Sequence, residues 1–239
     1  MKTIRPVPLL VILTLFLFGC DAESTLVEAP VPEAPLARLA KGGGPQGSIG
    51  YVVGFSNTRG TAIATERIGY GASFAPADIV RAGGGQTKIF IEPKRNHDRH
   101  VENAVASQAS YADDRNLSPR FIYWMIGLRK QRTPGSSLDQ KHQALALLDA
   151  ILQESGGAPV LINAMSAYDG HVCSGSGAYG PAVAEELLDY LEAAAPGAFI
   201  RIARFPALKR AETTDGCHPT EAIYERDAQL LMDEVNRVL

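Results

Sequence analysis

The sequence predicts an α/β fold in which a parallel sheet is covered by helices on both faces. Short β-like apolar runs alternate along the chain with stretches of helical periodicity, an order that is typical of parallel sheets. The chain has 239 residues, of which 46% are hydrophobic and 21% are charged, so it can bury a substantial core. We therefore expect a three-layer α/β/α domain with a five-stranded parallel sheet.

The expected strands are short runs rich in β-branched and aromatic residues. They span 49–55, 79–82 or 88–91, 121–126, 160–164 and 199–205. The expected helices are stretches in which many apolar residues recur every three or four positions. They span about 97–112, 137–155, 181–195 and 219–239. Pro219 suits the first turn of the last helix, because the N–H that proline lacks would have no partner there.

The first residues predict a bacterial secretory signal. Lys2 and Arg5 precede an apolar run over 9–18, which is too short to cross roughly 30 Å of hydrocarbon as a helix. The segment 17–20 resembles the bacterial lipobox, in which the cysteine is diacylated through its sulfur after cleavage before it. This resemblance implies that Cys20 carries a lipid. A plain secretory signal or a short anchor remains the alternative.

The lipobox resemblance implies that the protein lies in the bacterial cell envelope, anchored to a membrane by lipid. Asp21 is similar to the residue that keeps enterobacterial lipoproteins at the inner membrane, so we expect the periplasmic face of that membrane. The expected parts are a signal peptide over 1–19, a lipidated tether over 20–47, rich in Ala, Pro, Glu and Gly, and a single domain over 48–239.

Two polar segments follow strands at the expected carboxyl edge of the sheet, where ligand groups gather in this fold class. Ser56 lies in a Gly-x-Ser turn after the first strand and can expose its hydroxyl at a helix start; alternatively it only caps the helix. Asp215 and His218 lie three residues apart before the last helix. A carboxylate in that position can orient the imidazole toward a nucleophile, whereas the alternative is a capping Asp with a surface His.

Together these two segments resemble the SGNH or GDSL hydrolase superfamily, over residues 48–239. The resemblance implies a flavodoxin-like SGNH hydrolase fold. It also implies that Ser56 is the nucleophile, that His218 is the general base and then the general acid, and that Asp215 orients the imidazole. Phe55 stands where the family usually has the Asp of its Gly-Asp-Ser block.

The same resemblance suggests an oxyanion hole made of three donors. They are the backbone N–H of Ser56, a glycine after the second strand, for which we favour Gly84 within 83–85, and a donor after the third strand. Donors of this kind are worth roughly 3 to 4 kcal/mol each. Near Gly127 the sequence departs from the family, because Arg129 replaces the expected asparagine. Either the Gly127 N–H or the Arg129 guanidinium supplies the donor, or the site has lost efficiency. Arg129 could also select an anionic substrate.

The cysteine and histidine residues have other possible roles. Three cysteines are too few for a disulfide scaffold or a four-cysteine zinc site. With Cys20 lipidated, Cys173 and Cys217 remain, and in an oxidising compartment we expect them to pair; a catalytic Cys217 is the alternative. The His-x-x-His pair at 97 and 100 could bind metal, but a solvated helix start is favoured. His171 could line the pocket, although a loop role is favoured.

These observations predict a membrane-anchored serine esterase that works through an acyl-enzyme and needs no metal or organic cofactor. Within the range of the superfamily, its substrates would be O-acyl groups on envelope carbohydrate or lipid, or small esters. The alternative is a catalytically weak SGNH-like lipoprotein that binds glycan or an envelope partner. A net charge of −3 argues against nucleic acid as the main partner. Residues 58–60 supply too few phosphate-binding features to favour a nucleotide binder. The sequence does not predict the oligomeric state.

Overall fold

The computed structural model describes residues 49–70 and 119–239, which belong to one compact unit, Ala34–Leu239. The signal peptide, the tether, the strand expected at 79–82 or 88–91 and the helix expected at 97–112 lie outside the described residues.

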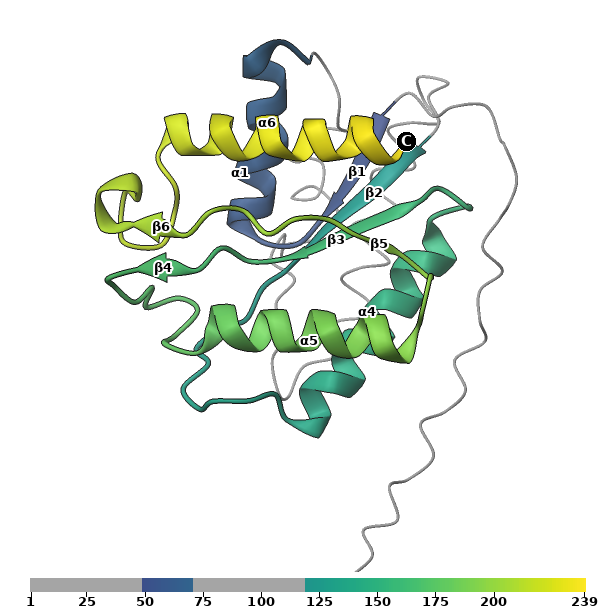
Figure 1. Ribbon diagram of the computed structural model, residues 1–239, viewed down its shortest axis with the longest axis horizontal. Helices are drawn as coiled ribbons and strands as arrows, with labels where there is room; N and C mark the ends of the chain where they lie inside the picture. Colours follow the sequence, from purple (N-terminus) through teal and green to yellow (C-terminus); the bar gives the residue numbers. More distant parts are fainter. Residues whose placement is uncertain (1–48, 71–118) are drawn as a thin grey trace, which may run out of the picture. The chain divides into compact units, whose positions relative to one another are not determined.

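The central sheet of the described residues is parallel and has four strands in the order β1-β2-β3-β5 (Figure 1). Their bounds are β1 Ile49–Val53, β2 Pro119–Ile126, β3 Val160–Ala164 and β5 Ile200–Arg201. Every residue of β1 and β3 is buried, which is typical of a sheet covered on both faces. Trp124 of β2 pairs with Val53 on one side and Ile162 on the other, and its side chain is buried.

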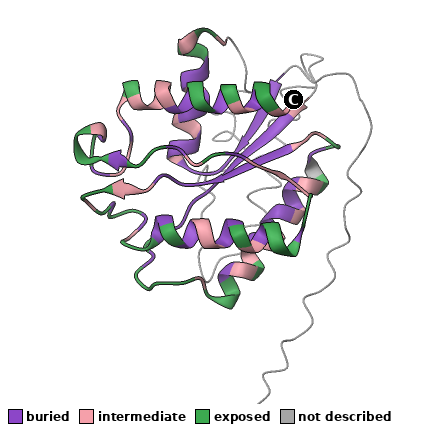
Figure 2. Ribbon diagram, in the orientation of Figure 1, coloured by how far each residue is buried: buried purple, intermediate pink, exposed green. Residues whose placement is uncertain are grey.

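Helices cover both faces of this sheet (Figure 1). On one face α1, Ser56–Thr65, packs against α6, Glu221–Val238. A π-helical turn, Glu66–Tyr70, continues α1. On the other face α4, Leu138–Glu154, packs against α5, Gly180–Ala194. The buried stripes of these helices face the sheet (Figure 2), so the predicted α/β class with a parallel sheet is confirmed.

A second, two-stranded sheet was not predicted. Its strands β4, Tyr168–Asp169, and β6, Leu208–Lys209, run parallel to each other, and a 3-10 turn over Arg210–Glu212 follows. Strands of two residues leave no periodic pattern in a sequence. This small sheet joins the segment that follows β3 to the segment that follows β5.

The described sheet has four strands, and the strand expected between β1 and β2 falls in residues 71–118, outside the described part, so the fifth strand stays a prediction. The start of the last helix needs correction. The last helix begins at Glu221 with Thr220 as its N-cap, so Pro219 lies before the helix and not in its first turn. There Pro219 forms an antiparallel bridge with Thr213, which closes the loop between them.

Within the described ranges, 49–70 and 119–239, none of the helices is both long and apolar enough to span a bilayer.

Candidate active site

Ser56 occupies the first residue of α1, immediately beyond a sharp turn at the end of β1. Gly54 has a φ of 148°, and a Cβ added there would lie 2.3 Å from Thr58 Oγ1, so the turn requires glycine. Thr58 Oγ1 instead accepts a hydrogen bond from the Phe55 N–H, at 3.2 Å. The first turn of the helix closes through a bond from Arg59 N to Phe55 O, at 3.0 Å. This local structure holds the serine hydroxyl at the carboxyl end of β1.

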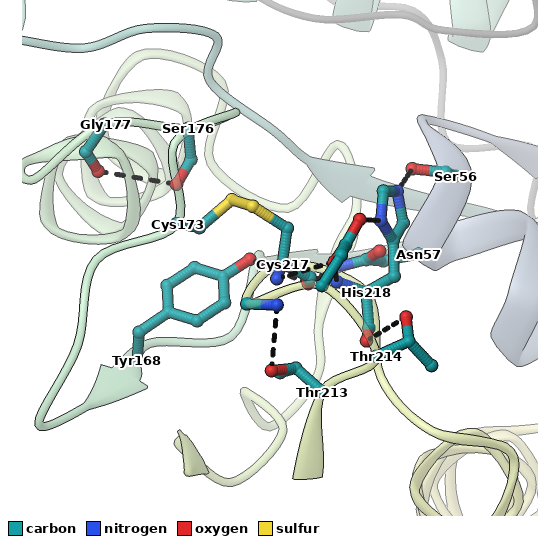
Figure 3. The surroundings of a disulfide bond; sticks show 12 residues. Ser56, Asn57, Tyr168, Cys173, Ser176, Gly177, Thr213, Thr214, Cys217 and His218 are labelled. Carbon is teal, nitrogen blue, oxygen red and sulfur yellow. Dashed lines mark hydrogen bonds and ion pairs between the residues drawn. A yellow bond between two sulfur atoms is a disulfide. The ribbon is translucent and has the colours of Figure 1, made fainter. Parts of the chain in front are cut away.

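Ser56, His218 and Asp215 form a continuous chain of hydrogen bonds. Ser56 Oγ lies 2.9 Å from His218 Nε2, and His218 Nδ1 lies 2.6 Å from Asp215 Oδ2. Because the carboxylate can only accept, Nδ1 carries the ring proton and leaves the Nε2 lone pair facing the serine O–H. Figure 3 shows the Ser56 hydroxyl directed at the ring of His218. The structure thus brings together the three candidate residues, of which one follows the first strand and two precede the last helix.

Backbone hydrogen bonds keep Asp215 ionised. Its Oδ1 accepts the N–H of His218 at 2.8 Å and that of Cys217 at 2.9 Å. The bond from the His218 N–H, together with the ring of His218 and the Cys217 N–H, lowers the pKa of Asp215 to about 2 against the opposing effect of burial. The carboxylate is therefore charged over the whole neutral range, as an orienting group for an imidazole should be.

The loop that carries Asp215 and His218 is closed on itself. Thr213 and Pro219 form an antiparallel bridge at its base, and the Thr214 N–H donates to His218 O at 2.8 Å. These bonds fix the backbone on both sides of the imidazole, before α6 begins.

The predicted disulfide between Cys173 and Cys217 is present, with a sulfur to sulfur distance of 2.06 Å (Figure 3). It joins the loop after β4 to the loop that carries His218. Because the Cys217 sulfur is bonded to Cys173, the alternative of a catalytic Cys217 is wrong for this disulfide-bonded form.

Of the three expected oxyanion-hole segments, two are described. Gly127 directly follows β2, and a Cβ added there would lie 2.5 Å from ring carbons of Phe55, so this glycine leaves space for the buried Phe55 ring. Arg129 is exposed in the loop beyond Gly127. Gly84 lies outside the described residues. Phe55 therefore fills the space between the serine turn and the loop after β2.

The loop after β2 pairs with the loop that contains Cys173. Lys130 N donates to Gly175 O at 2.9 Å, and Gln131 N donates to Ser176 O at 2.7 Å. The loops after β2, β4 and β6 are thus linked in series, by these two bonds and then by the disulfide. The linked loops hold His218 at the end of the sheet where Ser56 lies.

Three polar residues at the site were missed by the sequence reasoning. Asn57 Nδ2 and the Tyr168 hydroxyl both donate to Cys217 O, at 3.4 and 3.2 Å. The Tyr224 hydroxyl donates to Asn57 Oδ1 at 3.4 Å. Two of them carried a usable signal, because Asn57 directly follows the candidate serine and Tyr168 follows a buried strand at its carboxyl end.

The other candidate residues from the sequence, His171, His97, His100 and Cys20, take no part in the described site. His171 Nδ1 lies 3.1 Å from Asp169 O, and its ring stands edge-on to the ring of Tyr168 with centroids 5.2 Å apart, so it packs within its own loop. His97, His100 and Cys20 lie outside the described residues. In the part of the chain that the structure describes, no group of three or more His, Cys, Asp or Glu side chains is placed to hold a metal ion.

Comparisons with protein-family models and with curated proteins find no match to this chain.

Proposed function

We propose that this protein is an SGNH-like serine hydrolase that cleaves an ester by acyl transfer. The observation that carries the proposal is the chain of hydrogen bonds from Ser56 Oγ through His218 to the Asp215 carboxylate. A serine, an imidazole with a fixed tautomer and an ionised carboxylate are the parts that nucleophilic acyl transfer requires.

In the first half of the reaction, Ser56 Oγ attacks the carbonyl carbon of the ester while His218 Nε2 takes its proton. His218 then donates that proton to the oxygen of the leaving alcohol as the bond between carbonyl carbon and oxygen breaks. Asp215 holds the Nδ1–H and stabilises the imidazolium that forms between the two transfers. The alcohol departs and the acyl group stays on Ser56.

In the second half, a water attacks the acyl-enzyme and gives its proton to His218 Nε2. The bond between the acyl carbon and Ser56 Oγ then breaks, the proton returns to the serine, and the carboxylic acid leaves. Ser56, His218 and Asp215, which carry out these steps, all lie in the described part of the chain.

A serine-directed fluorophosphonate probe tests the proposal. We expect the full-length protein to be labelled, Ser56→Ala to lose all labelling and Asp215→Asn to label at least tenfold more slowly, because the Asn side chain favours the wrong imidazole tautomer. Ser174→Ala is the matched control, since Ser174 is exposed on a loop tied to the same site. A folded wild-type protein that stays unlabelled would contradict the proposed activity.

The second candidate is a catalytically weak protein of the same fold that binds glycan or an envelope partner. It is favoured by Arg129, which stands exposed where the family resemblance leads us to expect a donor asparagine. Comparing Arg129→Asn with wild type on neutral and carboxylated esters separates the possibilities. A faster variant indicates a compromised oxyanion hole, a selective loss on carboxylated esters indicates anion recognition, and unchanged preference rules out recognition by Arg129.

Two finer parts of the expectation belong to the same proposal. The first is the five-stranded SGNH arrangement, which needs one strand beyond the four described. The second is a lipid anchor at Cys20 in the bacterial envelope, with the inner membrane favoured by Asp21. Metabolic labelling with a palmitate analogue, compared between wild type and Cys20→Ala, tests the anchor. We expect wild type to take up the label and Cys20→Ala, which lacks the sulfur that would carry the lipid, to stay unlabelled; a wild type that stays unlabelled would contradict the anchor.

A further inference from the structure

The imidazole of His218 faces solvent and is not held by burial. Its side chain is 40% exposed and that of Asp215 is 53% exposed. A side chain on an exposed loop is free to move unless specific bonds restrain its backbone. The position of His218 relative to Ser56 therefore depends on what holds the loop.

The carbonyl of Cys217, the residue before His218, is restrained by two side chains from outside the loop. The Tyr168 hydroxyl donates to it at 3.2 Å and Asn57 Nδ2 donates to it at 3.4 Å. Tyr168 belongs to β4 and Asn57 to α1, so the carbonyl is held between two different elements of the fold. Figure 3 shows Tyr168 and Asn57 beside Cys217.

Asn57 connects this carbonyl directly to the nucleophile. It is the residue after Ser56 in the first turn of α1, and it is buried. Its Oδ1 accepts from the Tyr224 hydroxyl of α6 at 3.4 Å, which turns the amide so that Nδ2 points at Cys217 O. The same helical turn that presents Ser56 thus also grips the residue next to His218.

Tyr168 is suited to act as a permanent donor. Burial raises the pKa of its phenol to about 12, against the opposing effect of side-chain hydrogen bonds with Asn57 and Ser176. The hydroxyl therefore keeps its proton at any pH used for assay. Its backbone is fixed because Tyr168 pairs with Leu208 in the small sheet, two residues before the turn that leads to the His218 loop.

We propose that Tyr168 and Asn57 are positioning residues that hold the Cys217 carbonyl, and through it the imidazole of His218, within hydrogen-bonding distance of Ser56. The kinetic side of this inference rests on the proposed function, since it needs Ser56 to be the nucleophile. The geometric side does not. Neither residue touches the reacting atoms, so both act through the His218 loop.

The first test measures the rate of fluorophosphonate labelling of the full-length protein. Tyr168→Phe keeps the ring and removes only the hydroxyl, and we expect the maximal labelling rate to fall roughly three- to tenfold, the value of one neutral hydrogen bond. The concentration of probe at half-maximal rate should not change, because the probe does not contact Tyr168. Asn57→Asp replaces the donor by an acceptor, and its maximal labelling rate should fall by at least the same factor.

The matched control is Tyr190→Phe. Tyr190 lies on α5, where its ring is 5.3 Å from Lys141 Nζ, and it has no part in the proposed machinery. This variant should label at the wild-type rate. A Tyr168→Phe protein that also labels at the wild-type rate would overturn the proposal.

The second test reads the imidazole without any reaction. The Nδ1 proton of His218, hydrogen-bonded to Asp215, should give a far-downfield proton resonance that Asp215→Asn abolishes. Tyr168→Phe should broaden or shift this resonance and Tyr190→Phe should leave it unchanged. If wild type is never labelled by the probe but Tyr168→Phe still changes the resonance, the positioning role is supported and the esterase is rejected. An unchanged resonance rejects the positioning role, even where thermal unfolding shows that the variant is less stable.

Discussion

The pKa values of two aspartates, Asp215 and Asp227, are shifted in opposite directions by different physical causes. Asp215 is half exposed, yet the N–H groups that it binds lower its pKa to about 2. Asp227 on α6 is 2% exposed, and burial raises its pKa to about 6, against the opposing effect of Arg226. Hydrogen bonds to the charged form decide the first case and desolvation decides the second. The stability that Asp215 contributes is present above its ordinary pKa and is lost as pH falls through about 2.

Asp227 should make the protein less stable as pH rises. A carboxyl whose folded pKa is raised binds its proton more tightly in the folded state, so its cost is absent well below the unfolded pKa, grows as pH rises and is fully present above about 6. We expect Asp227→Asn to gain stability relative to wild type by roughly 1 kcal/mol between pH 5 and pH 7.5.

Urea unfolding of both proteins across this pH range measures the effect. Asp227→Asn also weakens the bonds from Arg226, at 2.8 and 3.0 Å, so the difference at any single pH mixes two effects. The slope against pH isolates the titration. A difference that stays constant from pH 5 to pH 7.5 would show that Asp227 has an ordinary pKa.

At the scale of elements, α1 and α6 approach each other closely because α1 carries a glycine at the contact. A Cβ added at Gly60 would lie 2.3 Å from a ring carbon of Tyr224. The same Tyr224 donates to Asn57, so the distance between the two helices also sets the geometry beside Ser56.

Gly60→Ala should destabilise the fold by about 1 to 3 kcal/mol, the usual cost of forcing extra atoms into a packed contact. The helix propensity of alanine would alone favour the variant, so the sign of the change reports the clash. Chemical unfolding provides the measurement, with Gly175→Ala as the control, since its added Cβ would meet its nearest neighbour at an ordinary 3.4 Å. A Gly60→Ala protein as stable as wild type would mean that the helices separate at no cost.

The contact between α5 and β5 shows how charge is matched between elements. Glu185, Asp189 and Glu192 lie on one face of α5, and the guanidinium of Arg201 on β5 pairs with all three. The carboxylates of Asp189 and Glu192 lie 2.7 and 2.8 Å from Arg201 Nη1. Because such pairs near the surface contribute little to stability individually, we interpret the cluster chiefly as neutralising an acidic stripe on the helix.

Long elements could be predicted from the sequence and short ones could not. The prediction of 160–164 coincides with β3, because a mostly apolar run of five buried residues, interrupted only by Asn163, leaves a clear pattern. The helix expected over 137–155 became Leu138–Glu154, helped by the Ser137 cap that accepts from Gln140 N at 3.2 Å. By contrast, β4 and β6 have two residues each and owe their existence to tertiary contacts.

The reactive side chains of the candidate site could be predicted, but the residues that hold them in place could be predicted only in part. Ser56, Asp215 and His218 are the residue types that acyl transfer needs, and each follows the end of an expected strand. Their hydrogen bonds require the segment after β1 to meet the segment before α6, which the fold provides. Tyr168 could be located from the sequence, because it follows a buried strand at its carboxyl end. Its partner could not, because the bond from the Tyr168 hydroxyl to Cys217 O joins residues far apart in the chain and leaves no local pattern.

At the scale of the whole molecule, the disulfide connects the His218 loop to the rest of the sheet edge. Cys217 is held at its N–H by Asp215, at its carbonyl by Tyr168 and Asn57 and at its sulfur by Cys173. Only the last of these restraints is covalent and acts across 44 residues of chain. It therefore limits the unfolded chain as well as ordering the folded loop.

Removing the disulfide should lower both stability and the rate at Ser56. For a loop of 44 residues the entropy of the unfolded chain accounts for about 4 kcal/mol, so Cys173→Ala/Cys217→Ala should unfold at a clearly lower urea concentration. Below that concentration, where the variant is folded, its labelling by fluorophosphonate should still be slower than that of wild type. The His218 loop has lost its covalent restraint and is held only by the hydrogen bonds from Tyr168 and Asn57. Wild type treated with a dithiol should behave like the double variant, and the variant itself should not respond to the dithiol. If the variant instead labels at the wild-type rate while folded, the hydrogen bonds at Cys217 hold the loop without the covalent link.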